Sequence, residues 1–197
     1  MAFKPKTPKR VYIAGPLFNS KEREEAEEIA EIVERAGYRT YVPHRDGCLY
    51  RDVIKELKAF TLSKRKAEKL AQKAIFLLDF YQVTKKCDMT VFNMNGRVPD
   101  EGGIVEAVLA YAYGKGLVIY KQDARTLIDG IDNPMLTGLT DFEIVTDIKW
   151  IPHALRKVQR HPVNTKKRME LARQLILAHS RNNSPYGLAR FAYENFP

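Results

Sequence analysis

Strand-like runs alternate with helix-like runs over the first 145 residues, and this alternation constrains the fold more than any other feature of the sequence. Five runs rich in β-branched and aromatic residues are "RVYIAG" (10–15), "YRTYVP" (38–43), "DMTVFNM" (88–94), "LVIYK" (117–121) and "DFEIV" (141–145). Helical patterns lie between them, most clearly in residues 20–37 and 102–113. We therefore expect an α/β fold: a doubly wound, flavodoxin/Rossmann-like sheet of about five parallel strands flanked by helices, with a C-terminal helical extension.

Capping residues place the ends of two helices. Ser20 is a suitable N-cap for the first helix, which stops at Gly37, and Gly114 ends the second. Residues 52–86 form a long charged amphipathic segment, in which "AIFLLDF" (74–80) fits a helix or a strand by periodicity alone. A short helical turn is expected at "NPMLTGL" (133–139). The loops after the first four strands are candidate ligand-binding loops, because ligands of such sheets bind at the carboxyl ends of the strands.

The positive net charge of +9 is located at the two ends of the chain. Residues 1–10 carry +4 and residues 151–197 carry +7, so the part between them carries −2. We expect an α/β domain over residues 1–150, with a basic tail at 1–9, and a basic helical extension over 151–197. We interpret the extension as solvated helices that pack on the core or on a neighbouring subunit, with binding to a nucleic-acid backbone as the alternative.

The composition argues against a membrane protein and against a disulfide framework. No apolar run approaches the roughly 20 residues of a membrane helix, and no signal-like apolar stretch follows the basic start. The default location is therefore the cytoplasm. Cys48 and Cys87 stand in no CxxC or Cys/His spacing, so neither a zinc site nor a disulfide is expected.

One carboxylate lies inside a helix at a predicted ligand-binding edge. Glu106 follows "PDEGG" (99–103) by about one turn and shares a helical face with Gly102, Gly103 and Ala110. Small residues leave room above the carboxylate, and the nearby helix N-terminus favours its ionised form. The sequence therefore predicts an anionic, unobstructed Glu106, which suits a nucleophile or a charge stabiliser. A surface glutamate on an ordinary helix is the alternative.

Three separated motifs make the chain resemble the nucleoside 2-deoxyribosyltransferase family. They are "VYIAGPLF" (11–18), "AIFLLDFYQVTKKCDMTVFNMNG" (74–96) and "DEGGIVEAVLAYAYGKGLVIY" (100–120), within a match that spans about residues 10–145. The resemblance favours a helix for Ile75–Asp79. The basic segment after Trp150 lies outside the common core of the family, so the resemblance implies no role for it.

The resemblance implies a role for each of four side chains. In the family a glutamate attacks the anomeric carbon of a 2′-deoxynucleoside and holds the deoxyribose covalently until a second base arrives, and Glu106 matches this nucleophile. Tyr12 matches the tyrosine that orients the nucleophile. Asp79 matches the acid beside the leaving base, and Asp100 matches the acid that holds a sugar hydroxyl. Core packing of Tyr12, solvent exposure of Asp79 and helix capping by Asp100 are the structural alternatives.

The loops are expected to supply further substrate contacts. The candidates are Gly15, Pro16, Arg45, Asp46, Gly103, Asn133 and Met135. Arg45 and Asp46 fall where the family shapes its base pocket, although a charged turn explains them nearly as well. Asn133 and Met135 match a substrate-lining turn, whereas Asn133 alone is also a suitable cap for a helix that starts at Pro134.

Transfer of 2-deoxyribose between nucleobases is the function that the resemblance implies. It also implies 2′-deoxynucleosides and free nucleobases as partners, a homo-oligomer, and no metal or organic cofactor. Hydrolysis of 2′-deoxynucleosides or of their 5′-monophosphates is the enzymatic alternative, because the same glutamate serves both reactions. The charge of Asp100 suits a neutral 5′-hydroxyl and opposes a phosphate, which favours nucleosides. A nucleic-acid-binding module is a third interpretation, motivated by the basic extension alone.

Overall fold

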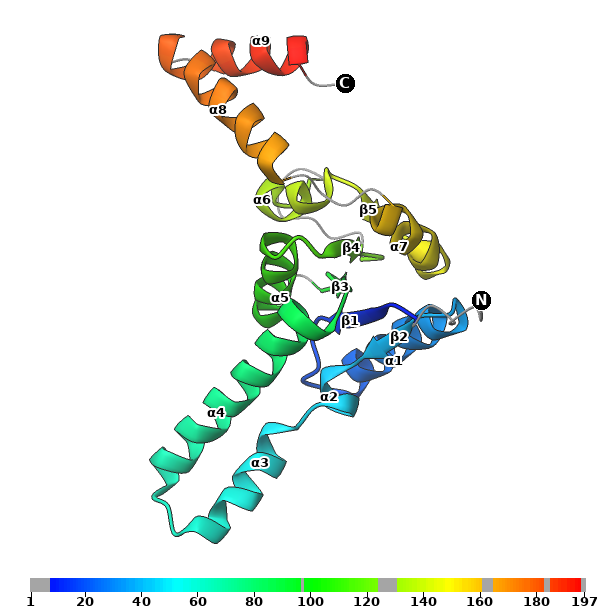
Figure 1. Ribbon diagram of the computed structural model, residues 1–197, viewed down its shortest axis with the longest axis vertical. Helices are drawn as coiled ribbons and strands as arrows, with labels where there is room; N and C mark the ends of the chain where they lie inside the picture. The colour runs from blue at the N-terminus through cyan, green and yellow to red at the C-terminus, as the bar shows by residue number, and fades with distance from the viewer. Residues whose placement is uncertain (1–7, 97, 124–130, 161–164, 183–184, 196–197) are drawn as a thin grey trace, which may run out of the picture. The chain divides into compact units, whose positions relative to one another are not determined.

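A five-stranded parallel sheet forms the centre of the fold (Figure 1). The computed structural model describes residues 8–96, 98–123, 131–160, 165–182 and 185–195. The strands are β1 (Arg10–Ala14), β2 (Arg39–Tyr41), β3 (Met89–Asn93), β4 (Gly116–Tyr120) and β5 (Ile144–Val145). Their order is β2-β1-β3-β4-β5, and every neighbouring pair is parallel. This is the flavodoxin-like order of a doubly wound sheet, so the expected fold class is confirmed.

Helices fill the connections between the strands and follow the last strand. The longer ones are α1 (Ser20–Arg35), α3 (Tyr50–Leu57), α4 (Lys64–Tyr81), α5 (Glu101–Ala112), α7 (Ile151–Arg160), α8 (Thr165–Asn182) and α9 (Pro185–Asn195). Single turns are α2 (Pro43–Asp46), α6 (Pro134–Thr137), and the 3-10 turns η1 (Lys58–Phe60), η3 (Gly138–Thr140) and η4 (Ile148–Trp150). A π-helical turn, η2 (Gln82–Lys86), continues α4. In this described part of the chain, no helix is long and apolar enough to cross a membrane.

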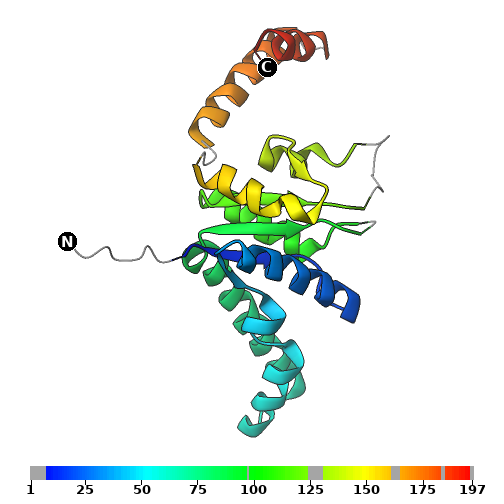
Figure 2. The same ribbon diagram turned by 90° about the vertical axis from the view of Figure 1, so that its right-hand side faces the viewer.

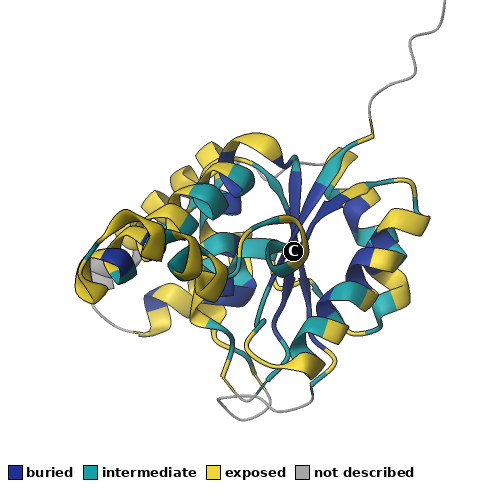
Figure 3. Cartoon of the chain, turned by 90° about the horizontal axis from the view of Figure 1, so that it is seen from below, coloured by how far each residue is buried: buried dark blue, intermediate teal, exposed yellow. Residues whose placement is uncertain are grey.

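Two hydrophobic cores lie on opposite faces of the sheet, because successive side chains of a strand point to opposite sides. Val11 and Ile13 of β1 pack with α1 and α7, whereas Tyr12 and Ala14 pack with α5 and η2. Figures 1 and 2 show α1 and α7 on one side of the strands and α5 on the other. In Figure 3 the strands are buried between helices whose outer surfaces are exposed. The side-chain alternation of β1 thus assigns Tyr12 to the α5 face.

The ambiguous segment "AIFLLDF" is helical, since it forms the last turns of α4. This agrees with the family resemblance. The first helix is capped by Asn19 rather than by Ser20: the Asn19 side chain accepts a hydrogen bond from the Glu22 N–H, and the Glu22 carboxylate accepts one from the Asn19 N–H in return. This reciprocal pair satisfies two N–H groups, which a Ser20 cap without a glutamate three residues on would not.

The chain divides into two compact units, Met1–Val163 and Asn164–Pro197. The division falls later than the boundary near Trp150 that the charge balance indicated. Ile151 and Leu155 of α7 are fully buried in the core on the α1 face, so α7 belongs to the α/β unit despite its basic surface. The charged side chains of α7 lie on its exposed face and do not show which domain the helix belongs to. Its buried apolar side chains do, because they pack in the core of the first unit. The second unit consists of α8 and α9, which contact each other.

Candidate active site

A tyrosine and a glutamate from distant parts of the chain meet on the α5 face. The Tyr12 hydroxyl donates a hydrogen bond to Glu106 Oε1 at 2.5 Å. Tyr12 is completely buried in β1, and Glu106 is partly buried one turn inside α5. The contact forms because both side chains project from elements packed against each other in the same core. One carboxylate oxygen of Glu106 is therefore held in place, and the other oxygen is not engaged by this bond.

Asp79 lies beside this pair, at the end of α4. The pKa of the Asp79 carboxyl is raised to about 6 by burial, and the nearby Tyr12 hydroxyl acts in the opposite direction. Burial also raises the pKa of Tyr12, and the charges of Glu106 and Asp79 raise it further. The Tyr12 phenol consequently stays protonated over the whole physiological range and remains a hydrogen-bond donor.

Glu106 binds its proton more tightly than an ordinary glutamate. Its pKa is raised to about 8: burial is the largest cause, the hydrogen bond from Tyr12 acts in the opposite direction, and the charges of Asp79 and Asp100 add to the rise. The structure therefore opposes the anionic Glu106 that the sequence predicts, because burial and the neighbouring carboxyl groups favour the protonated form. The helix N-terminus acts at short range, and burial beside two other carboxyl groups outweighs it.

Asp100 caps the helix that carries Glu106. Its Oδ2 accepts a hydrogen bond from the Gly103 N–H at 2.5 Å. The capping alternative from the sequence is thus observed, and it engages one of the two carboxylate oxygens. Because Asp100 also raises the pKa of Glu106, the two carboxyl groups lie close enough to interact electrostatically.

Two glycines allow the loop after β1 to approach α5 and β3. A Cβ on Gly103 would lie 2.5 Å from a ring carbon of Phe92 and 3.1 Å from the Gly15 Cα. Gly15 has a φ of +143°, and a Cβ there would lie 3.0 Å from both Cβ and O of Asn93. Gly103 is therefore required for close packing of the helix start, in addition to leaving space near Glu106.

Arg45 is held against α1, on the opposite side of the sheet from Glu106, and Asp46 is bound to the start of its own turn. The Arg45 guanidinium pairs with Glu27 of α1 at 2.9 Å and with Glu34 of α1 at 3.0 Å. Asp46 accepts a hydrogen bond from the Val42 N–H at 2.8 Å, which together with Arg45 lowers its pKa although burial alone would raise it. These contacts fasten α2 to α1. They do not bring Arg45 to the Tyr12–Glu106 pair, because α1 packs on the other face.

Asn133 and Met135 form the start of α6. The Asn133 side chain accepts a hydrogen bond from the Met135 N–H at 3.0 Å, as expected for an N-cap before Pro134. The Met135 side chain is 83% exposed. None of the contacts observed in residues 131–160 joins either side chain to Glu106, whereas Leu136 of the same turn packs in the core that contains Tyr12.

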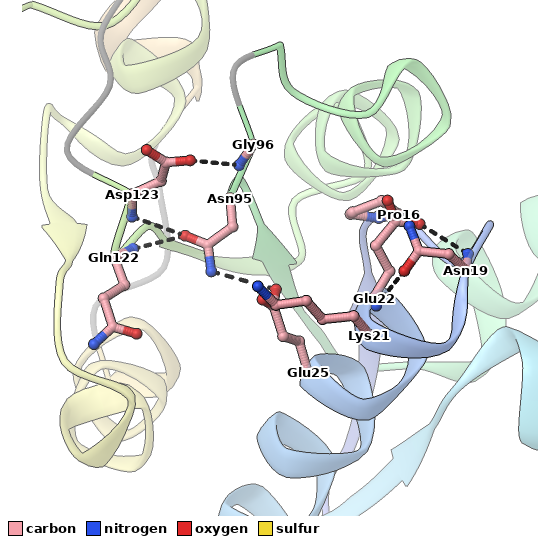
Figure 4. Close-up of a pocket in the computed structure, with 9 residues that line it drawn as sticks. All are labelled: Pro16, Asn19, Lys21, Glu22, Glu25, Asn95, Gly96, Gln122 and Asp123. Atoms are coloured by element: carbon pink, nitrogen blue, oxygen red, sulfur yellow. Dashed lines mark hydrogen bonds between the residues drawn. The ribbon is translucent and has the colours of Figure 1, made fainter.

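A hollow of about 390 Å³ opens at the carboxyl ends of β1, β3 and β4, on the side of α1 (Figure 4). Its lining residues are Pro16, Asn19, Lys21, Glu22, Glu25, Asn95, Gly96, Gln122 and Asp123. Asn95 connects the loops on both sides of the hollow. Its Oδ1 accepts hydrogen bonds from the backbone N–H groups of Gln122 and Asp123, and its side-chain amide donates a hydrogen bond to Glu25. None of the four family-matched residues lines the hollow. We interpret it as a hydrogen-bonded junction of three loops.

Tyr41 is a neighbour of the Tyr12–Glu106 pair that the sequence did not single out. It pairs with Tyr12 in the β1–β2 register, and the two rings stack with centroids 5.4 Å apart. No local pattern could have indicated this contact, because it depends on the register of two parallel strands. Across the residues that the structure describes, no group of three or more His, Cys, Asp or Glu side chains is arranged to hold a metal ion.

Residues 11–172 match the family described as Nucleoside 2-deoxyribosyltransferase. A conserved protein from Enterococcus faecalis V583 is 18% identical in sequence, with a TM-score of 0.54 over 76% of this chain and 98% of that one. A 2-desoxiribosyltransferase from Leishmania mexicana is 16% identical, with a TM-score of 0.47 over 78% and 99% of the two chains. A CMP N-glycosidase from Clostridium botulinum is 16% identical, with a TM-score of 0.45 over 75% and 99%. No curated protein matches the sequence.

Proposed function

The chain belongs to the nucleoside 2-deoxyribosyltransferase family, and from this membership we propose that it transfers 2-deoxyribose from a 2′-deoxynucleoside to a free nucleobase. The hydrogen bond from Tyr12 to Glu106, with Asp79 beside it, is the observation that carries the proposal. It joins three of the four residues that match the family's reacting groups. Asp100 joins the same set through its electrostatic effect on Glu106.

Near neutral pH, Asp79 and Glu106 share one proton, and the reacting form is the one that has the proton on Asp79 and an ionised Glu106. In the proposed first step, the Glu106 oxygen that Tyr12 does not hold attacks the anomeric carbon. A carbon–oxygen bond forms, the bond between that carbon and the base nitrogen breaks, and its electron pair leaves with the base. Asp79 gives the base a proton, so that the base departs as a neutral molecule. The product is a covalent deoxyribosyl-Glu106 ester.

The second step reverses the first with a different base. A nitrogen of the incoming base attacks the anomeric carbon, the ester bond to Glu106 breaks, and the base gives a proton to Asp79. Two inversions retain the configuration of the sugar. Tyr12 remains a donor to the carboxyl throughout, because its raised pKa prevents it from losing its own proton.

The remaining family-matched residues are proposed to position the substrate. One oxygen of Asp100 is engaged by the Gly103 N–H, and we assign the other to the sugar 5′-hydroxyl. Gly15, Pro16 and Gly103 would admit the sugar near Glu106. A role in the base pocket is not proposed for Arg45, because its guanidinium is engaged by α1.

Incubation with deoxyinosine and adenine tests the function directly. Formation of deoxyadenosine supports transfer, and formation of hypoxanthine without any acceptor supports hydrolysis by the same covalent route. The same assay with deoxyinosine 5′-monophosphate tests the assignment of Asp100, which predicts poorer use of the phosphorylated donor. Absence of both base exchange and base release would remove the proposed function.

The proposed acid and nucleophile predict a bell-shaped pH dependence of kcat/KM. Asp79 and Glu106 have pKa values of about 6 and about 8, and we expect them to titrate as a pair. Below about pH 6 both groups are protonated and no anion can attack. Above about pH 8 both have lost their protons, and the base receives none. Initial rates between pH 5 and 10 should therefore peak near 7, whereas a curve that only rises or only falls would contradict the assignment.

We also propose that the protein is a homo-oligomer that associates through α4 and α5. Partly exposed apolar side chains cluster on these helices: Phe76, Leu77, Tyr81, Val105, Val108 and Tyr113. Phe80 of α4 and Tyr113 of α5 touch edge to face, which joins the two helices into one surface. An apolar surface of this kind is typical of an interface between subunits.

Sedimentation velocity should therefore show a dimer or larger species for the wild type, and a shift towards monomer for Phe76→Glu. Phe142→Glu is the matched control, because Phe142 is the same residue type and is also exposed, at 68% against 57% for Phe76, but lies next to β5. It should leave the wild-type species intact. A wild type that sediments as a monomer at micromolar concentration contradicts the proposal.

A further inference from the structure

A π-helical turn, η2, directly follows the last turn of α4, which carries Asp79. The Cys87 N–H donates a hydrogen bond at 2.8 Å to the Gln82 carbonyl five residues back, whereas the partner in an α-helix lies four residues back. Such turns are rare, and they are frequently found at functional sites. The place of η2 next to Asp79 indicates that the turn serves the position of that side chain.

The π turn keeps one side of this helix directed at the core. Buried or partly buried side chains repeat every four residues, at Ala71, Ile75, Asp79 and Val83. In an α-helix of about 3.6 residues per turn, this spacing would carry the row around the helix by roughly 40° at each step. A π turn is wider and reverses this drift. Val83 is therefore completely buried in the core that contains Tyr12, and η2 contacts both β1 and α5.

Thr84 supplies a hydrogen bond at the junction of the two helical forms. Its Oγ1 donates to the Phe80 carbonyl oxygen at 2.6 Å, and the residue is only 2% exposed. Phe80 follows Asp79 in the chain, and its ring meets the Tyr113 ring of α5 edge to face, with the centroids 6.1 Å apart. A threonine hydroxyl that binds the carbonyl four residues back often bends a helix. The bond thus helps to set how the turn that carries Asp79 lies against α5.

From this geometry we propose that Thr84 is a positioning residue for Asp79: its hydrogen bond to the Phe80 carbonyl holds the last turn of α4 where the Asp79 carboxyl can reach the departing base. The inference rests on the proposed function, in which Asp79 gives that base a proton. Thr84 acts on the backbone and takes no part in the proton transfer itself. A valine has nearly the same shape, so the hydroxyl rather than the volume of the side chain carries the role.

Thr84→Val and Thr84→Ser test this role with two donors. The base of an ordinary purine deoxynucleoside needs a proton to leave as a neutral molecule, whereas a base methylated at N7 does not. A displacement of Asp79 by about 1 Å should lower kcat/KM of Thr84→Val roughly 10-fold to 100-fold for the ordinary donor, and less than about threefold for the methylated one. Thr84→Ser keeps the hydroxyl and should restore most of the wild-type ratio between the donors. Equal effects on the two donors, or no effect on either, overturn the inference.

The pKa of Asp79, from an NMR titration of its side-chain carboxyl carbon, is a second readout that needs no activity. Burial raises this pKa to about 6 in the wild type. A displaced carboxyl gains contact with water, so its pKa should fall by about one unit in Thr84→Val and stay near the wild-type value in Thr84→Ser. An unchanged pKa in Thr84→Val contradicts the inference. If the wild type shows neither base exchange nor base release, the proposed function fails, yet this titration still decides the role of Thr84.

Thr137→Val is the matched control for both readouts. The Thr137 hydroxyl also donates to the carbonyl four residues back, that of Asn133 at 3.4 Å, and the residue is 5% exposed, but it lies in α6. Its substitution should change neither the ratio between the donors nor the pKa of Asp79. Should Thr84→Val fail to fold, Thr84→Ala takes its place in both measurements, because it removes the hydroxyl without placing a methyl group against the Phe80 carbonyl.

Discussion

Glu106→Gln should lower turnover by roughly four to six orders of magnitude, as expected when a nucleophile is lost. The amide keeps the shape of the side chain and an oxygen for the Tyr12 hydroxyl, but it cannot form the deoxyribosyl ester. The wild type, quenched with a donor that carries fluorine on carbon 2 of the sugar, should accumulate the ester because fluorine slows its breakdown. Mass spectrometry should place the added sugar on the peptide that contains Glu106.

The same substitution should stabilise the protein at alkaline pH. The pKa of Glu106 is about 8 in the folded state against an ordinary value of 4.5, so the folded chain keeps a proton that the unfolded chain releases. The wild type therefore loses stability as the pH rises from about 4.5 to about 8, on the order of a few kcal/mol, whereas a glutamine stays neutral. Thermal melts should show Glu106→Gln about 5 °C above wild type at pH 8.5, with no advantage at pH 4.

Glu101→Gln provides the matched control for both effects. Glu101 lies in the first turn of the same helix but is exposed, so its substitution should change neither turnover nor the melting difference between pH 4 and 8.5 appreciably. Two outcomes would overturn the mechanism: substantial activity in Glu106→Gln, or a sugar label on Asp79 or Asp100 in the wild type.

Asp79→Asn should lower kcat/KM by about 100-fold to 10,000-fold for an ordinary purine deoxynucleoside, which is the usual contribution of general acid catalysis. The reason is that an asparagine cannot protonate the departing base. A purine deoxynucleoside methylated at N7 carries a positive charge on the base and leaves as a neutral molecule without a proton. Its reaction should fall by less than about tenfold in the same variant. Initial rates with both donors give the ratio that tests the role of Asp79.

Glu68→Gln is a suitable control for this comparison, because Glu68 lies earlier on α4 and pairs with the exposed Lys64 at 3.9 Å. This substitution should leave the rates with both donors unaffected. If Asp79→Asn slowed the two donors equally, Asp79 would be a substrate-binding or structural group rather than the acid. If it slowed neither, Asp79 would have no role in the reaction.

Much of the fold was predictable because its signals are local. Alternation of strand-like and helix-like runs predicted the parallel sheet, and Asp100 before two glycines predicted the start of α5, where the carboxylate does accept a hydrogen bond from Gly103. The segment "AIFLLDF" was undecided, because a short apolar run satisfies a buried strand and a helix equally. Only the continuation of α4 into a π-helical turn that packs on β1 and α5 decided it.

The sequence by itself determined which side chains are candidates for the chemistry: a tyrosine in the first strand, an acid at the end of a long helix, and a glutamate one turn after a capped helix start. Only the tertiary structure decided their protonation. Tyr12 and Glu106 are 94 residues apart in the chain yet share a hydrogen bond, and the pKa of Glu106 depends on how much water its neighbours exclude and on the charges of Asp79 and Asp100. The local signal, a helix N-terminus, predicted an anion. Desolvation and like charges are set by packing between elements distant in the sequence, and here they outweigh the local effect.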